Sequence, residues 1–217
     1  MENIDLLFER VDYVAYFGLV GGEPTLNPDL GRILAYIGEK YGDKCGRLTF
    51  VINGTRKLSC DVLSAMKKHD VYLLISDYTE FVPYDGSLED LTREIDGHGL
   101  EYDVRHSQVW SDFGFPSSPA ERTKEETAYH LRSCHPEWNG LNDGKFYYCN
   151  ISWSAEKSGK FELNMDDYIG LKKINANDKE ACRSIVNLSR GSSSFCRICG
   201  GCGRDNTDYV PVGLQVI

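Results

Sequence analysis

Three cysteines lie close together near the end of the chain, in the sequence Cys196-Arg197-Ile198-Cys199-Gly200-Gly201-Cys202. Two more, Cys134 and Cys149, stand upstream on either side of a segment rich in aromatic residues. Thiolates at Cys-x-x-Cys spacing can converge on one centre, and soft sulfur ligands select zinc or iron–sulfur clusters. The neighbouring glycines permit the positive-φ turns that fold a loop around a metal. The pattern favours a metal site held by these five cysteines over a set of buried thiols without a function.

Composition limits the classes of protein to which the chain can belong. Its 217 residues, 41% of them hydrophobic and 12% aromatic, are enough for one substantial core or two small domains. The net charge of −9 argues against nucleic acid and anionic membranes as partners. No apolar run approaches the ~20 residues of a membrane span, and we expect no membrane association. Eight cysteines without a secretory signal predict a reducing compartment, hence a cytoplasmic protein.

The first half of the chain alternates between apolar runs and amphipathic segments. The pattern predicts a first helix over residues 3–11 and then strands over 13–20, 48–52, 71–75 and 100–104. Between the strands it predicts a helix over 28–41, a helix that begins at Ser59 or Asp61, and a helix over 88–95. Asn27 is the expected N-cap of the second helix and Pro28 its first-turn proline. This is the rhythm of βα units in an α/β fold. In such folds the site lies on the loops after the strands, here 21–24, 53–55 and 76–78.

The pattern changes between residues 106 and 120, where we place a domain boundary with a linker-like segment at 116–119. Beyond it we expect a hairpin over 145–153, a turn or helix start at 164–168, and a helix over 178–188 that buries Cys182. Aromatic side chains are expected to surround the metal site: Trp110, Phe113, Phe115, Trp138, Tyr147, Tyr148 and Trp153.

Gly21-Gly22-Glu23-Pro24 after one strand, Asn53-Gly54-Thr55 after the next, and the late cysteines together resemble the radical S-adenosylmethionine (SAM) superfamily. The resemblance is to the branch with a C-terminal SPASM or Twitch iron–sulfur domain. There a GGEP motif contacts the amino group of SAM. The SPASM signature begins with Cys, nine to fifteen residues, Gly, four residues, Cys, and Cys134, Gly144 and Cys149 have this spacing. Cys196 and Cys199 fit its continuation.

The resemblance implies a partial (β/α)6 TIM-like barrel over residues 1–110, lacking its first strand, and an irregular Twitch-like cluster domain over 111–217. It implies one auxiliary 4Fe–4S cluster, with Cys134, Cys149, Cys196 and Cys199 as first-choice ligands and Cys202 as a rival to either of the last two. The implied SAM-binding residues are Gly21, Gly22, Glu23, Pro24, Asn53, Gly54, Ser76 and Asp77. Simple turn or capping roles remain the alternative for Glu23, Asn53, Gly54, Ser76 and Asp77.

The sequence departs from the family in two respects. It contains no Cys-x3-Cys-x2-Cys motif for the SAM-cleaving cluster, and its late cysteines are too few for a full two-cluster SPASM domain. Cys45 and Cys60 have neither the spacing nor the position to replace that motif. Our first hypothesis is therefore a fragment of a radical SAM enzyme that acts on a peptide or carbohydrate-type substrate, with a reductant such as ferredoxin or flavodoxin. The alternatives are a non-catalytic iron–sulfur module that works with a partner chain, and a zinc-stabilised binding protein. The edge of the strand over 13–20 predicts a homo-oligomer unless the helix over 3–11 covers it.

Overall fold

The computed structural model describes residues 1–81, 88–106, 109–114, 121–134, 138–203 and 206–212. The chain forms two compact units. The first contains Asp12–Val109 with Met1, Pro211 and Val212, and the second contains Glu2–Val11 and Trp110–Val210. The linker-like segment 116–119 and Phe115 lie outside the described residues.

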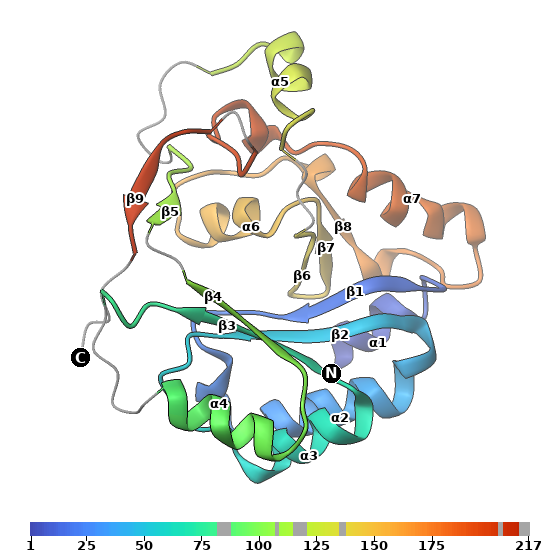
Figure 1. Cartoon of the computed structure of the whole chain (residues 1–217). Coiled ribbons are helices and arrows are strands. Elements are labelled where there is room, and N and C mark those ends of the chain that lie inside the picture. Colours follow the sequence, from blue (N-terminus) through green and yellow to red (C-terminus); the bar gives the residue numbers. More distant parts are fainter. Residues whose placement is uncertain (82–87, 107–108, 115–120, 135–137, 204–205, 213–217) are drawn as a thin grey trace. The chain divides into compact units, whose positions relative to one another are not determined.

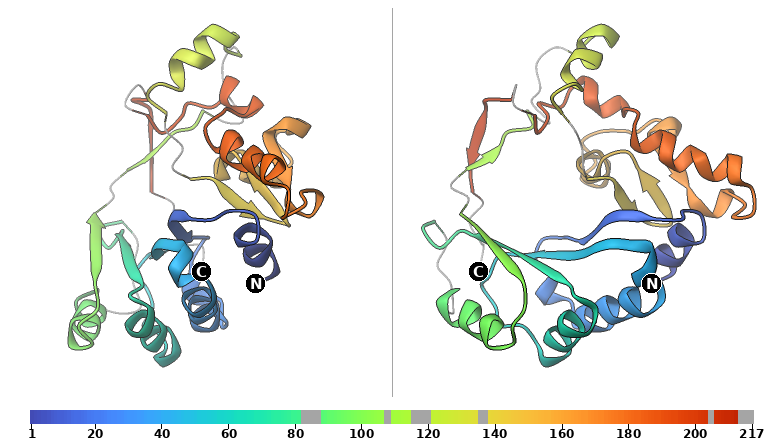
Figure 2. Two further views of the ribbon diagram at one scale, coloured as in Figure 1. Left: turned by 90° about the vertical axis from the view of Figure 1, so that its right-hand side faces the viewer. Right: turned by 45° about the vertical axis from the view of Figure 1, so that its right-hand side comes forward.

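The first unit is a four-stranded parallel sheet with helices on one face (Figure 1). Its strands lie side by side in chain order: β1 (Val14–Leu19), β2 (Cys45–Ile52), β3 (Tyr72–Asp77) and β4 (Tyr102–His106). The connecting helices are α2 (Leu30–Tyr41), α3 (Cys60–His69) and α4 (Leu88–Gly97). Figure 2 shows the same three helices beneath the sheet from two further directions. The predicted α/β class and the four predicted strands are confirmed.

The core of this unit lies between the sheet and the helices. Alternate residues of β3 and of β2 from Leu48 onward supply its buried apolar side chains: Leu48, Phe50, Ile52, Leu73 and Ile75. The helices contribute apolar residues spaced three or four apart, which places them on one side of each helix. They are Leu30, Leu34 and Ile37 from α2, Val62 and Met66 from α3, and Leu91 and Ile95 from α4.

The start of α2 differs from the prediction. The helix begins at Leu30, its N-cap is Asp29, and no side chain caps it. Asn27 instead closes the preceding turn, because its Oδ1 accepts the backbone N–H of Asp29 at 3.0 Å. A side chain that bonds two residues ahead forms a local turn, which competes with the capping geometry.

The second unit contains a three-stranded antiparallel sheet, β6 (Gly140–Asn142), β7 (Lys145–Tyr147) and β8 (Tyr168–Gly170). Its helices are α1 (Glu2–Phe8), α5 (Lys124–His130), α6 (Asn150–Lys157) and α7 (Lys179–Ser189). A separate two-stranded sheet pairs β5 (Val109–Ser111) with β9 (Tyr209–Pro211). Short 3₁₀ turns complete the chain: η1 (Pro24–Leu26), η2 (Gly42–Lys44), η3 (Met165–Asp167), η4 (Leu171–Lys173) and η5 (Ser194–Arg197).

Three expectations for this half are corrected. The hairpin predicted over 145–153 instead joins β6 to β7, and residues 150–157 form α6. The cause is the pair Asp143-Gly144, whose φ values of 53° and 71° form the two-residue turn of a hairpin. The helix at residues 2–8 belongs to the second unit, and its neighbour Arg10 donates to the Ile174 carbonyl. Cys182 on α7 is half-buried rather than buried.

Strand β1 is at one end of the strand order in the described sheet, and the side chains of Tyr16 and Val20 beside it are exposed. Association through this edge stays a prediction.

Among the described residues, no helix combines the length and the apolar character that crossing a membrane requires.

Candidate metal centre

All five predicted ligand cysteines lie in the second unit, on three separate segments. Cys134 follows the last turn of α5, and its N–H donates to the carbonyl of His130 at 3.1 Å. Cys149 is the N-cap residue of α6 and follows strand β7 directly. Cys196 lies in η5, and Cys199 and Cys202 lie on the glycine-containing turn after it.

The five thiols converge on one region. The sulfur atoms of Cys134 and Cys202 lie 3.8 Å apart. Burial, together with the negative charge of neighbouring sulfurs, raises the pKa of Cys196 to about 12 and that of Cys199 to about 11. Burial and Cys134 likewise raise the pKa of Cys149, and the contact with Cys134 raises that of Cys202. Without a cation, the region therefore holds neutral thiols at neutral pH.

Backbone N–H groups point at two of the sulfurs. The N–H of Ser193 donates to Cys196 Sγ at 3.4 Å, and the N–H of Gly201 donates to Cys199 Sγ at 3.3 Å. Such donors stabilise negative charge on a thiolate and orient its lone pairs. The two cysteines of the Cys-x-x-Cys motif thus sit in prearranged thiolate-binding turns.

The turn that carries Cys199 and Cys202 is tied to β5 and to Asn206. The N–H of Gly200 donates to the Phe113 carbonyl at 2.7 Å. The Asn206 amide bridges the carbonyls of Asp112 and Gly201 at 2.8 and 2.7 Å. A Cβ on Gly200 would lie 2.8 Å from the Asp112 carbonyl oxygen, so this close approach requires glycine.

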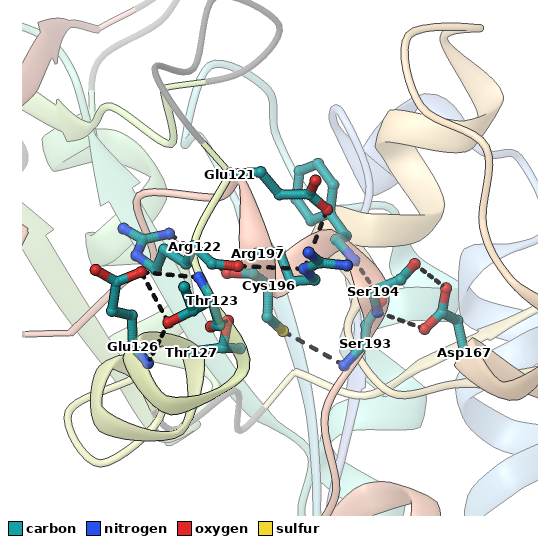
Figure 3. Close-up of polar contacts among 11 residues, drawn as sticks. Glu121, Arg122, Thr123, Glu126, Thr127, Asp167, Ser193, Ser194, Cys196 and Arg197 are labelled. Carbon is teal, nitrogen blue, oxygen red and sulfur yellow. Dashed lines mark hydrogen bonds and ion pairs between the residues drawn. The ribbon is translucent and has the colours of Figure 1, made fainter.

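A buried carboxylate anchors the segment before Cys196 (Figure 3). Asp167, which is 3% exposed, accepts the backbone N–H of Ser194 at 2.6 Å and that of Asn164 at 2.7 Å. It also accepts the Ser194 hydroxyl. Residues 164–168 do form the expected turn, but Asp167 points inward and fixes η5.

An arginine holds the other side of the motif. Arg122 Nη1 donates to the Cys199 carbonyl at 2.7 Å, and its backbone N–H donates to the Arg197 carbonyl at 2.8 Å. In return, Arg197 Nε donates to the Arg122 carbonyl, as Figure 3 shows. The charge of Arg122 also opposes the rise in the pKa of Cys199, since a nearby cation favours the thiolate.

Aromatic residues surround part of the thiol region. Tyr147 and Phe195 pack with Cys199 in one apolar cluster, to which Phe113 and Trp153 add. Tyr148 is buried, and burial followed by the charge of four of the thiols raises its pKa. The remaining two described candidates do not enclose the site, because Trp110 and Trp138 are 42% and 53% exposed.

The separation of the thiols bears on which metal group they could hold. Within the described part of the chain, no three His, Cys, Asp or Glu side chains are placed to hold a single metal ion. A tetrahedral zinc with four Zn–S bonds of ~2.3 Å needs every pair of sulfurs about 3.8 Å apart. A 4Fe–4S cluster binds each cysteine to a different iron, so its ligands stand farther from one another. The five converging thiols therefore fit a cluster in number and chemical type, and fit a single zinc less well.

In the first unit, the side chains predicted to bind SAM are joined by local hydrogen bonds. Glu23 Oε1 accepts the N–H and hydroxyl of Thr25 at 3.0 and 2.6 Å, and Oε2 accepts the N–H of Asn53 at 2.7 Å. Glu23 thus links the loop after β1 to the end of β2. Asn53 Oδ1 accepts the N–H and hydroxyl of Thr55 at 3.0 and 2.7 Å, and Gly54 has a φ of 73°, as a tight turn requires.

The loop after β3 repeats this pattern and adds a histidine. Asp77 Oδ1 accepts the N–H and hydroxyl of Thr79 at 2.9 and 2.6 Å, and Oδ2 lies 2.6 Å from His106 Nδ1. Burial alone would raise the pKa of Asp77, but the bonds from Thr79 and His106 lower it. Ser76 points to the opposite face of β3, since side chains alternate along a strand.

The first two glycines of the GGEP motif have free space around them. A Cβ added to Gly21 or Gly22 would meet no atom within 4 Å. Neither has a positive φ. Packing within the described residues therefore does not require glycine at these positions.

The first unit also has a cavity of about 640 Å³ at the opposite, amino ends of the strands. Cys45, Arg47 and His69 line part of it. It includes none of the predicted site residues.

No family model matches this sequence, and no curated protein matches it.

Sequence reasoning missed four residues that position the thiols: Arg122, His130, Asp167 and Asn206. Arg122 contacts Cys199, 77 residues away, and Asn206 contacts Asp112, 94 residues away, so no local spacing could reveal these two. A signal existed only for Asp167, which follows Asn164 at the spacing of a capping box.

Replacing Asp167 tests its role as the anchor of η5. Asp167→Ala removes the buried carboxylate that accepts the N–H groups of Ser194 and Asn164, so we expect the free energy of unfolding to fall by roughly 2–3 kcal/mol. Asp166→Ala is the matched control, because that neighbouring carboxylate is exposed and its loss should change stability by less than about 0.5 kcal/mol. Urea denaturation at pH 7 measures both. Equal effects would contradict the anchoring role.

The raised thiol pKa values predict how the stability of the reduced, metal-free protein depends on pH. Because the folded pKa values of Cys196 and Cys199 are about 12 and 11, against an ordinary value of 9.0, the folded state holds its protons longer than the unfolded state. This contribution is complete below pH 9 and is lost as the pH rises through 11 to 12. Denaturation at pH 8 and pH 10.5 should show the loss, and Cys199→Ser should reduce it. A stability that does not change over this range would contradict the burial of these thiols.

Proposed function

We propose that this chain is an iron–sulfur protein of the radical SAM type, whose second unit binds a 4Fe–4S cluster through four of the five late cysteines. The observation that carries the proposal is the convergence of thiols from three sequence segments on one region. Soft thiolates in that number are the ligands of such clusters.

Cys196 and Cys199 are the first pair of ligands. Backbone donors already point at their sulfurs, and the N–H of Gly201 and that of Ser193 would stabilise the thiolates. Cys149 is the third ligand, and Cys134 and Cys202 compete for the fourth position, since their sulfurs lie 3.8 Å apart. When bound, the cluster supplies one-electron redox chemistry or an iron to which a substrate can bind.

The first unit supports the SAM part of the proposal. Its strands follow one another in chain order with all three helices on one face, which is how the strands of a (β/α) barrel are arranged. The partial barrel itself belongs to the proposal. The predicted loops lie at the carboxyl ends of β1, β2 and β3, where α/β proteins bind ligands. Gly21 and Gly22 leave their backbone open to a ligand, and the fixed Glu23 carboxylate suits an ammonium group.

The substrate class is a peptide or a carbohydrate, and an electron donor such as ferredoxin or flavodoxin would reduce the protein. We propose that these loops bind SAM, whereas its reductive cleavage by the intact form requires a Cys-x3-Cys-x2-Cys segment that the given residues do not include. A second candidate function is a zinc-stabilised binding protein. It is favoured by one distance, since 3.8 Å between Cys134 and Cys202 equals the sulfur separation expected across one tetrahedral zinc.

Metal analysis separates the two candidates. After anaerobic purification and reconstitution with iron and sulfide, we expect about four irons and four sulfides per chain and a brown, thiolate-to-iron absorbance. Cys149→Ser and Cys196→Ser should each lose most of the cluster. Cys182→Ser is the control, because Cys182 lies on α7 and its sulfur donates to backbone carbonyls instead. Stoichiometric zinc without sulfide would overturn the cluster.

Calorimetry with SAM tests the first unit. Glu23→Gln removes the charge that we place opposite the SAM ammonium group, so the affinity should fall about tenfold or more, as expected for a hydrogen bond between charged groups. Glu39→Gln on α2 is the control, since that carboxylate is exposed and pairs with Lys68. Equal affinities in the two variants, or no SAM binding by the unaltered protein, would contradict the SAM site while leaving the cluster proposal intact.

A further inference from the structure

His130 is the last residue of α5, and it is only 4% exposed although its side chain is polar. Burying an imidazole is costly unless its ring nitrogens find partners. No motif or spacing in the sequence predicts a function for His130. Its surroundings in the second unit supply one.

The imidazole packs against the turn that carries Cys202. A Cβ added to Gly201 would lie 2.5 Å from His130 Cε1 and 2.7 Å from His130 Nε2. The same point lies 3.4 Å from Cys134 Sγ. The ring edge that bears Nε2 and the Cys134 sulfur therefore border the same glycine. Glycine, here with a φ of 79°, is the only residue type that leaves room for both the His130 ring and the Cys134 sulfur.

The backbone of His130 holds the second cysteine of this pair. Its carbonyl accepts the N–H of Cys134 at 3.1 Å and the N–H of Ser133 at 3.2 Å. The Ser133 hydroxyl donates to the same carbonyl. One residue thus contacts both segments that bring Cys134 and Cys202 within 3.8 Å of each other.

We propose that His130 is a positioning residue of the metal centre, whose imidazole N–H donates a hydrogen bond to the metal-bound thiolate of Cys134 or Cys202. This inference rests on the proposed cluster. His130 itself is not a ligand in it, because five thiols already exceed the four that a cluster needs.

The bond has an electronic consequence. A donor to a ligand sulfur withdraws electron density from the thiolate, which stabilises the reduced cluster more than the oxidised cluster. His130 would therefore raise the reduction potential of the centre. It would also favour whichever of Cys134 and Cys202 it contacts as the fourth ligand.

Two variants and a control test this role in the reconstituted full-length protein. His130→Phe keeps a flat ring in the same space but removes the N–H, and His130→Gln restores an amide N–H donor. The control is His98→Phe, because His98 is exposed at the end of α4 in the first unit. Iron and sulfide content is measured first, and the midpoint potential follows from an anaerobic redox titration.

We expect His130→Phe to retain iron and sulfide and to have a more negative potential than the unaltered protein. His130→Gln should recover part of the difference, and His98→Phe should match the unaltered protein. An unchanged potential in His130→Phe with the cluster intact would overturn the inference. If neither the unaltered protein nor any variant takes up iron and sulfide, the proposed function is overturned, and the inference with it.

A second measurement does not depend on how the variants fold. In the unaltered protein labelled with ¹⁵N at histidine, pulsed EPR of the reduced cluster should detect one imidazole nitrogen and an exchangeable proton close to the spin. The absence of this coupling in a protein with a full cluster would overturn the hydrogen bond.

Discussion

The structure depends on placing several thiols together away from water. Two neighbouring thiolates in such a region repel each other, and neither is well solvated, so the protons remain until a cation replaces them. The segments that carry the thiols are held in place by hydrogen bonds between side chains and their backbone. Asp167 holds η5 through N–H groups, and Arg122 holds the Cys199 carbonyl. For the proposed metal centre, loops that are already ordered lower the entropic cost of binding.

In the first unit, the parallel strands end in ordered loops. Three successive strand ends use the same device, a side-chain oxygen that accepts both the N–H and the hydroxyl of a threonine two residues later. The acceptors are Glu23, Asn53 and Asp77. Their capping role and a role in ligand binding are compatible, since a carboxylate oxygen can accept more than one donor.

Periodicity along the sequence was enough to predict the first unit. Strands β1 to β3 contain apolar runs and the helices have amphipathic spacing, and alternate residues of β3 and of the second half of β2 are buried. Helix α6 was missed, since Asn150–Lys157 contains β-branched and aromatic residues and only Ser152 and Ala155 are buried. The pair Asp143-Gly144 is a hairpin signal that the prediction of a hairpin over 145–153 did not use, so the turn was misplaced. The grouping of the thiols was predicted from spacing, whereas the contacts of His130 and Asn206 depend on tertiary packing that spacing does not encode.

The membership of α1 in the second unit has a consequence for synthesis. Residues 2–11 leave the ribosome before the first unit, yet Arg10 finds its hydrogen-bond partner, the Ile174 carbonyl, 164 residues later. The helix is only seven residues long, and isolated helices shorter than about 12 residues are marginal in water. Its apolar face, which includes Leu7 and Phe8, therefore remains unpacked while the whole first unit is synthesised. During that interval the nascent chain carries an exposed apolar segment, a natural binding site for a chaperone.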